Sequence, residues 1–317
     1  MRITSIDQFR GFAILLMVLA NFLTDINTVP AWLHHSHDVG LTIIDLIAPL
    51  FILAIGLTYN LSFQRHASQD GLGRAYRSFF TRYLAIIGLG AIASAAITVY
   101  EVNSNGIEWG VLQAIGMAGL VTLAVIRLRT LYRWLIGFAL LGFYQFMMDR
   151  YWLEIVLRSP HGGFFGSFSW AAMLILATSL SDFFHDVEHR DKYYPLAAVL
   201  LLAIGIVLAF FIPISKNRVS APYVLVSLGV ASLIFYFFHW LSVRFHLKSR
   251  FLTAWGKNPL MLYVLHYVFI GLIFLPGIPF LYSEAPLWLV ILESIGLVGG
   301  ITLVAYWMER KNIVFSI

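Results

Sequence analysis

Long apolar runs alternate with short polar segments along the whole chain. Each run is roughly 18–22 residues long, enough to cross about 30 Å of hydrocarbon as an α-helix. The runs cover residues 9–27, 41–62, 79–100, 109–126, 132–149, 165–183, 195–213, 220–240, 259–277 and 286–307. This pattern predicts an all-α, polytopic integral membrane helix bundle of about ten transmembrane helices, forming a single domain over residues 1–317.

Composition supports a membrane environment for most of the chain. Hydrophobic residues make up 60% of the sequence and charged residues only 12%, whereas a soluble domain carries about 25% charged residues. The first run follows Asp7 and Arg10 and lacks a small-residue cleavage site, so we expect it to remain as a membrane span. The segments between runs are too short to fold as separate domains. We therefore expect any activity to lie within the helix bundle or at its edges.

The basic residues are distributed unequally between the two predicted sides of the membrane. One side holds 17 of the 21 lysines and arginines: Arg2, Arg10, Arg65, Arg74, Arg77, Arg82, Arg127, Arg129, Arg133, Arg190, Lys192, Arg244, Lys248, Arg250, Lys257, Arg310 and Lys311. The other side holds the remaining 4: Arg150, Arg158, Lys216 and Arg218. Because short cytoplasmic loops are enriched in basic residues, we expect both termini in the cytoplasm. The same distribution indicates membrane orientation rather than nucleic-acid binding.

The first predicted hairpin concentrates polar residues at the opposite, non-cytoplasmic end. Asn21 and Asp25 end the first run, and the second run carries Asp45 near its start. The loop between them contains His34, His35, His37 and Asp38. Three interpretations are open: a solvated loop, a metal site using His35, His37 and Asp38 or Asp25, or acid–base chemistry. In the last, an imidazole takes a proton while a carboxylate such as Asp45 fixes its tautomer.

The cytoplasmic start of the first helix has two possible roles. Ser5 could cap the helix, and Asp7 and Arg10 are spaced to form an ion pair, which would explain these residues by stability alone. An arginine at a helix start close to other basic residues would equally hold an anion such as a nucleotide phosphate.

Several further polar residues fall inside apolar runs or at their ends. An ionisable group in hydrocarbon is costly unless it faces the bundle interior or a wet cavity, so each such residue marks a possible site. They are Gln113 in the fourth run, His239 in the eighth, Lys257 and Asn258 before the ninth, Tyr263 and His266 within it, and Glu293 in the tenth. A satisfied structural role is the alternative for every one of them.

Taken in order, these segments resemble the heparan-alpha-glucosaminide N-acetyltransferase family. The similarity is densest in Ser5-Ile6-Asp7-Gln8-Phe9-Arg10-Gly11, Asn21, His35, and Gly40-Leu41-Thr42-Ile43-Ile44-Asp45-Leu46-Ile47-Ala48-Pro49-Leu50-Phe51. It continues in Gly110-Val111-Leu112-Gln113-Ala114-Ile115-Gly116 and in Gly256-Lys257-Asn258-Pro259-Leu260, followed by Tyr263 and His266. The similarity extends from residue 3 to roughly residue 270.

This resemblance implies a transmembrane acyltransferase that uses cytosolic acetyl-CoA. The family's catalytic histidine corresponds to His35, its asparagine at the end of the first helix to Asn21, and its carboxylates to Asp7 and Asp45. The candidates for the acyl-CoA site are then Arg10, Asp7, Gln113, Lys257, Asn258 and His266. No metal is expected. Asn21 or Gln113 could hold the oxyanion that develops on the thioester. The resemblance also implies that the chain can form a homodimer.

The sequence departs from the family pattern around the histidine. The family has a tryptophan in its His-x-x-Trp-x-Gly stretch, whereas here His37 stands two positions after His35. The choice of base among His34, His35 and His37 therefore stays open at this stage. So does the choice between a general base and an acylated histidine. The acceptor is expected to be an amine or a hydroxyl, sugar-like, at the extracytoplasmic face.

The leading interpretation is therefore a multi-pass, acyl-CoA-dependent N- or O-acyltransferase, expected in the cell membrane of a microbe. Its partners would be acyl-CoA, a small-molecule or glycan acceptor and membrane lipids. The main alternative is a secondary transporter with a path through Asp45, His266 and Glu293. A lipid- or partner-binding membrane protein without catalysis is the third.

Overall fold

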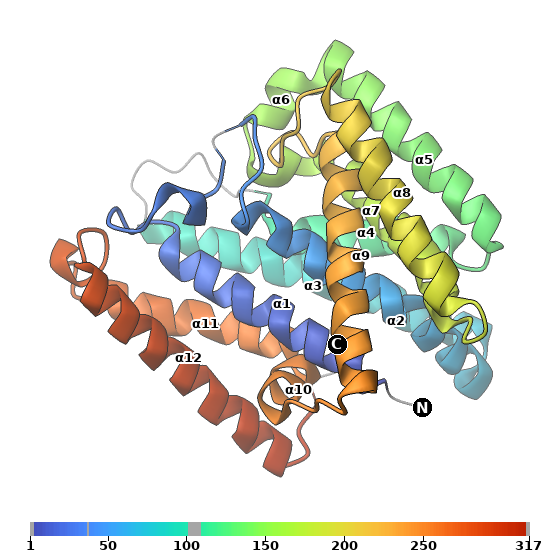
Figure 1. Cartoon of the computed structure of the whole chain (residues 1–317). Helices are drawn as coiled ribbons and strands as arrows, with labels where there is room; N and C mark the ends of the chain where they lie inside the picture. The colour runs from blue at the N-terminus through green and yellow to red at the C-terminus, as the bar shows by residue number, and fades with distance from the viewer. Residues whose placement is uncertain (1–2, 37, 101–108, 315–317) are drawn as a thin grey trace. The chain divides into compact units, whose positions relative to one another are not determined.

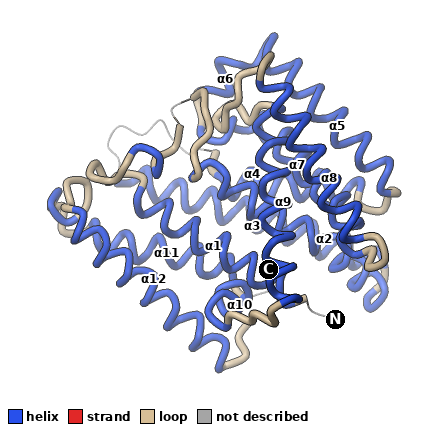
Figure 2. The backbone as a smooth tube through the Cα atoms, in the orientation of Figure 1, coloured by secondary structure: helices blue, strands red, loops and turns tan. Residues whose placement is uncertain are grey.

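The computed structural model of the chain describes residues 3–36, 38–100 and 109–314. In this part of the chain every regular element is helical, as the backbone view shows (Figure 2). The longer helices are α1 Thr4–Leu23, α2 Ile47–Asp70, α3 Leu72–Tyr100, α4 Val111–Val125, α5 Thr130–Met147, α7 Gly163–His185, α8 Arg190–Ala209, α9 Ala221–Arg244, α11 Pro259–Phe274 and α12 Leu287–Arg310. Two shorter ones are α6 Leu153–Leu157 and α10 Arg250–Lys257.

Each predicted apolar run overlaps one of the ten longer helices. Within the described residues, seven helices are long and apolar enough to cross a membrane, and the bent pair of α10 and α11 would make eight. The prediction of an all-helical, polytopic membrane bundle is thus confirmed. The count of about ten spans is not, because α4 has only 15 residues and the 18 residues of α5 include Arg133 and Gln145.

The main differences from the predicted boundaries lie at polar helix ends. Helix α1 begins at Thr4 rather than near residue 9, because its polar first turns are buried against other segments. Ser5 does not cap it: Ile3 is at the cap position, and the Ser5 hydroxyl lies 3.0 Å from Nδ1 of His239. Helix α10 was not predicted as a separate element. It meets α11 at a bend of 92°.

The contacts divide the chain into two compact units. The first contains residues 1–35, 42–51 and 234–316, and the second contains residues 36–41 and 52–233, with residue 317. Helices α2 and α9 contribute residues to both units. The prediction of one functional domain over residues 1–317 stays a prediction.

In the first unit α1 is packed against α10, α11 and α12 (Figure 1). The closest approach is between α1 and α10, where two glycines face each other. A Cβ atom on Gly11 would lie 1.9 Å from the Leu252 carbonyl oxygen, and one on Gly256 would lie 1.9 Å from the Asp7 carbonyl oxygen. Only glycine permits this backbone contact. It places the start of α1 directly against the last turn of α10.

In the second unit α7 is the central helix, in contact with α4, α5 and α8. Small side chains allow this close packing: Ala171, Ala172 and Ala177 are fully buried. The buried hydroxyls of Thr178 and Ser179 donate to the Ile175 carbonyl at 2.7 and 3.2 Å. These bonds satisfy polar groups that have no water to bind inside a membrane.

Candidate active site

The loop after α1 presents His35 to a buried carboxylate. Asp45 lies in the 3₁₀ turn Ile44–Leu46, just before α2, and its side chain is 0% exposed. His35 Nδ1 lies 2.8 Å from Asp45 Oδ1. The other oxygen of Asp45 accepts hydrogen bonds from the Thr42 backbone N–H and the Thr42 hydroxyl, both at 3.0 Å. These bonds hold the carboxylate in place.

This geometry assigns the tautomer of His35. An ionised carboxylate only accepts, so the proton of the neutral ring lies on Nδ1 and the lone pair on Nε2. The His35 side chain is 34% exposed. A buried aspartate bonded to Nδ1 of a partly exposed histidine is an arrangement suited to general-base catalysis.

The neighbouring histidines differ from His35 in their surroundings. His34 has its two ring nitrogens 3.1 Å from the carbonyl oxygens of Thr24 and Val29, so it fastens the loop to the end of α1. His37 lies outside the described residues. Of the described histidines in this loop, His35 is the one that lies against a carboxylate.

Asp38 of the loop has its partners within the second unit. Asp38, in the second unit, forms an ion pair with Arg218 and accepts from the Ser215 hydroxyl at 2.9 Å. The Arg218 guanidinium lowers the pKa of Asp38 below its ordinary value of 3.8. Across the described residues, no group of three or more histidines and carboxylates is placed to hold a metal ion.

A second polar cluster lies between α1 and α11. Asn21 Nδ2 donates to His266 Nε2 at 2.9 Å, and His266 Nδ1 donates to the Tyr263 carbonyl. Asn21 Nδ2 also lies 3.4 Å from the Tyr267 hydroxyl, which is 3.0 Å from the Tyr263 hydroxyl. His266 is completely buried, and both of its ring nitrogens have partners within the protein.

These bonds of His266 determine how the Asn21 amide is turned. Its Nδ1 faces a carbonyl that only accepts, so the neutral ring has its lone pair on Nε2, and the Asn21 side chain must turn its NH₂ group toward it. The orientation of the Asn21 amide is thereby fixed. Amide and phenol donors in such a cluster can stabilise negative charge on a reacting oxygen.

The basic end of α1 brings Arg10 beside α10. Arg10 Nη1 lies 3.4 Å from Asp7 Oδ1 and 3.4 Å from the Gly256 carbonyl oxygen. The expected Asp7–Arg10 pair is therefore formed, and Arg10 reaches the residue that precedes Lys257.

Lys257 and Asn258 connect α10 to the end of the chain that the structure describes. Lys257 Nζ lies 2.8 Å from Glu309 Oε1. Asn258, at the bend between α10 and α11, is buried and donates to the Ile313 carbonyl at 3.0 Å. Asp7, Arg10, Lys257 and Asn258 therefore belong to one neighbourhood at the basic end of the first unit.

Gln113 lies in the second unit and has a structural contact. Its Oε1 accepts from the Gly110 backbone N–H at 3.1 Å, which closes the first turn of α4. The sequence interpretation did not identify Tyr267 as part of the Asn21 cluster. Tyr267 follows His266 by one residue and Tyr263 by four. The second spacing was the available signal, because residues four positions apart lie on the same face of a helix.

Two comparisons with known proteins bear on this site. A family model described as "Heparan-alpha-glucosaminide N-acetyltransferase, catalytic" matches residues 2–241. The match includes Asn21, His35 and Asp45 and ends before α10, α11 and α12. The search of curated proteins finds no match for this chain.

Proposed function

The chain belongs to the heparan-alpha-glucosaminide N-acetyltransferase catalytic family, and from this premise we propose that it moves an acetyl group across the membrane. The donor is acetyl-CoA on the side that carries most of the basic residues. The acceptor is an amine or a hydroxyl at the opposite face. As a member of a transmembrane acetyltransferase family with several apolar helices, the chain is an integral membrane protein.

The observation that carries the proposal is the His35–Asp45 pair. Asp45 holds Nδ1 of the imidazole, so Nε2 takes the proton from the acceptor nitrogen or oxygen as that atom attacks the thioester carbon. The new C–N or C–O bond forms and the C–S bond breaks. The sulfur leaves as the thiolate of CoA, and the proton on Nε2 passes to it. In this proposal His35 is the catalytic base and Asp45 is a positioning residue.

Asn21 is proposed to stabilise the tetrahedral intermediate. One N–H of the amide stays bonded to His266, which fixes the direction of the amide, and the other exchanges its long 3.4 Å contact with the Tyr267 hydroxyl for the oxyanion. Removal of one such donor lowers kcat by about 10²–10³-fold in other acyl-transfer enzymes. A role of Gln113 in binding acyl-CoA stays a prediction. Its side chain accepts a hydrogen bond from the Gly110 backbone N–H in the second unit, which is a structural contact.

Arg10 and Lys257 are proposed to hold the phosphates of acetyl-CoA. Asp7 orients Arg10, and Asn258 supports the bend that follows Lys257. Arg10 and Asn21 are 11 positions apart on α1, which corresponds to about 16 Å at 1.5 Å per residue. The pantetheine arm would extend along this distance, so that the charged nucleotide stays at the basic end.

The acceptor is proposed to be sugar-like, as the family description implies for its founding activity. The membrane is proposed to be the cell membrane of a microbe, with both termini on the cytoplasmic side. Homodimer formation is the family-level expectation for its assembly.

Release of free CoA tests the proposal. The chain contains no cysteine, so a thiol-reactive dye reports CoA without a protein background. We expect the purified protein to release CoA from acetyl-CoA when a suitable amine or amino sugar is present. His35→Ala should lower the rate by about 10²–10⁴-fold, the usual contribution of a general base.

His34→Gln is the matched control, since His34 is the adjacent residue and is bonded to backbone carbonyls. It should retain the rate within a few-fold. An equal loss of CoA-release rate in both variants would show that the rate depends on the structure of the loop and not on the His35 imidazole. CoA release by His35→Ala at the wild-type rate would contradict the proposal.

A further inference from the structure

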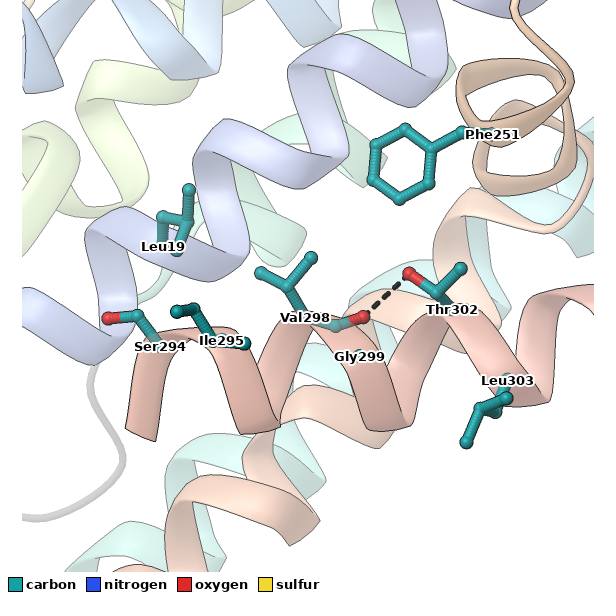
Figure 3. Close-up of a pocket in the computed structure, with 8 residues that line it drawn as sticks. All are labelled: Leu19, Phe251, Ser294, Ile295, Val298, Gly299, Thr302 and Leu303. Atoms are coloured by element: carbon teal, nitrogen blue, oxygen red, sulfur yellow. Dashed lines mark hydrogen bonds between the residues drawn. The ribbon is translucent and has the colours of Figure 1, made fainter. Parts of the chain in front are cut away.

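An apolar groove lies along α12 on the face turned toward α1 and α10. Its volume is about 690 Å³, within the range of about 300–1,000 Å³ that is typical of ligand sites. Figure 3 shows Leu19 of α1 and Phe251 of α10 on one side and the α12 residues opposite them. The α12 residues are Ser294, Ile295, Val298, Gly299, Thr302 and Leu303.

The groove offers almost no hydrogen bonds to an occupant. The Thr302 hydroxyl donates to the Val298 carbonyl at 2.6 Å and accepts from Trp255 Nε1 at 3.1 Å. Ser294 is the other polar residue of the lining, and the remaining side chains are hydrocarbon. An apolar occupant therefore fits the groove, and a polar one would lose its hydration without compensation.

Gly299 keeps the groove open. A Cβ atom added to this residue would have no heavy atom within 4 Å, other than those of its own helix and chain neighbours. Helix α12 is also one of the helices that are long and apolar enough to cross the membrane. Only 22% of its apolar 18-residue segment is buried within the protein. Ile295 and Leu303 of the lining are 65% and 72% exposed, so in a bilayer the groove would be open to the acyl chains of lipids.

One end of the groove leads to a strongly basic surface. Phe251 follows Arg250, whose guanidinium lies over the Tyr306 ring at 5.2 Å and whose side chain is 66% exposed. Glu309 pairs with both Arg250 and Lys257. Segments 245–257 and 303–311 contain this one carboxylate against five lysines and arginines: Lys248, Arg250, Lys257, Arg310 and Lys311. This excess of positive charge would attract an anionic group.

We propose that the groove binds one acyl chain of an anionic phospholipid, with the lipid phosphate held by Arg250, Arg310 and Lys311. Basic surfaces between transmembrane helices at the cytoplasmic end of a membrane protein bind acidic lipid headgroups. Trp307, 56% exposed near the same end of α12, is placed as interfacial tryptophans are. A second copy of the chain is a poorer occupant, because a symmetric contact would bring two sets of these cations together.

Native mass spectrometry of the full chain in detergent tests the proposal. The protein is incubated with equal amounts of phosphatidylglycerol and phosphatidylcholine that have the same acyl chains. We expect retained phosphatidylglycerol to exceed phosphatidylcholine several-fold. Arg250→Gln should reduce this preference about fivefold, the factor expected for one basic side chain at an anionic surface, and should leave binding of phosphatidylcholine unchanged.

Gly299→Leu should fill the groove and reduce retention of both lipids several-fold. Gly142→Leu is its matched control, since Gly142 is an exposed glycine of α5 that likewise has no heavy atom within 4 Å of an added Cβ. Leucine is a better helix former than glycine, so both variants should fold.

Three results would overturn the proposal. One is equal retention of the two lipids by the wild-type protein. Another is equal retention by Gly299→Leu and Gly142→Leu. The third is a loss of dimer mass, rather than of lipid, in Gly299→Leu, which would assign the groove to a second copy of the chain.

Discussion

At the scale of single residues, the candidate chemistry depends on pairs that fix the orientation of a side chain. Asp45 fixes the ring of His35, and His266 fixes the amide of Asn21. The first pair joins residues 10 positions apart, whereas the second joins residues 245 positions apart. In both pairs the residue that sets the orientation, Asp45 or His266, is buried. Folding of the chain therefore supplies the free energy that keeps the side chain of His35 or Asn21 in its orientation.

Asp45→Asn tests the role of the carboxylate in positioning His35. The amide of asparagine can donate as well as accept, so it permits the tautomer that has its proton on Nε2. We expect kcat to fall by about 10³–10⁴-fold, by analogy with the effect of the corresponding change in a serine-protease triad, with KM for acetyl-CoA within a few-fold of wild type. The measurement is steady-state CoA release. A large rise in KM at unchanged kcat would contradict a positioning role.

His266→Ala tests the support of Asn21. Removal of the ring frees the amide of Asn21 to rotate, so kcat should fall about as far as in Asn21→Ala, and the double variant should be little slower than either single one. Rates of CoA release for the four proteins give the coupling between the two residues. Multiplicative losses in the double variant would show that the two side chains act independently.

The Asp38–Arg218 pair predicts a dependence of stability on pH. The pKa of Asp38 is lowered in the folded protein, so the stability gained from the pair is fully present above the ordinary value of 3.8 and is lost as the pH falls through the lowered pKa. Asp38→Asn should therefore lower the melting temperature by about two degrees at most at pH 7, because partly exposed pairs contribute about 1 kcal/mol or less. The difference from wild type should disappear in strong acid. A difference that persists there would exclude the ion pair as its cause.

Much of the candidate site could be predicted from residues that are close in the sequence. His35, Thr42 and Asp45 lie in one short segment, and the possible role of Asp45 in fixing an imidazole follows from that proximity. The structure adds the difference between His34 and His35. Both ring nitrogens of His34 lie against backbone carbonyl oxygens, whereas Nδ1 of His35 lies against the Asp45 carboxylate. The Asn21–His266 and Asp38–Arg218 contacts could not be foreseen, because neither helical periodicity nor loop composition shows which distant segments pack together.

At the scale of elements, the crossing of α1 and α10 positions the basic end of the site. The two helices touch through backbone atoms at Gly11 and Gly256, and Arg10 reaches the Gly256 carbonyl at this crossing. The apolar run 259–277 predicted the start of α11, and Pro259 fits that position because proline is tolerated in the first turn of a helix. The apolar runs did not predict α10, because it is an amphipathic helix of only eight residues with low overall hydrophobicity and lies between two of the runs.

Gly11→Ala should separate α1 from α10. Its methyl group would lie 1.9 Å from the Leu252 carbonyl oxygen, so the helices must shift, at a cost of about 1–3 kcal/mol. We expect a lower melting temperature and a higher KM for acetyl-CoA. Gly88→Ala is the control, because an added Cβ on this α3 glycine has no heavy atom within 4 Å, and alanine favours the helix. Similar melting temperatures for the two variants would show that the crossing tolerates a side chain.

At the scale of the whole molecule, the sequence predicts orientation from charge alone. The continuous apolar runs located the helices well because each membrane-spanning helix needs an apolar segment of about the same length. The ends of the helices were less predictable, because polar residues such as those at the start of α1 continue the helix when other segments cover them. The two contact units have no signature in the order of the runs, since each draws on segments from distant parts of the chain.

Single cysteines in the cysteine-free chain test the predicted orientation. Gln69→Cys, at the exposed end of α2, should react with a membrane-impermeant maleimide only after intact cells are permeabilised. Glu284→Cys, in the exposed loop before α12, should react in intact cells. The reverse pattern would place the 17 basic residues outside and contradict the proposed side for acetyl-CoA.

The most direct test of transmembrane acetyl transfer uses proteoliposomes. Protein inserted in one orientation receives acetyl-CoA, labelled in its acetyl group, on the side of the basic loops, and an amine acceptor is enclosed on the other side. The labelled acetyl group should appear on the enclosed acceptor with wild-type protein and not with His35→Ala. Acetylated product found only on the side to which acetyl-CoA was added would contradict transfer across the membrane.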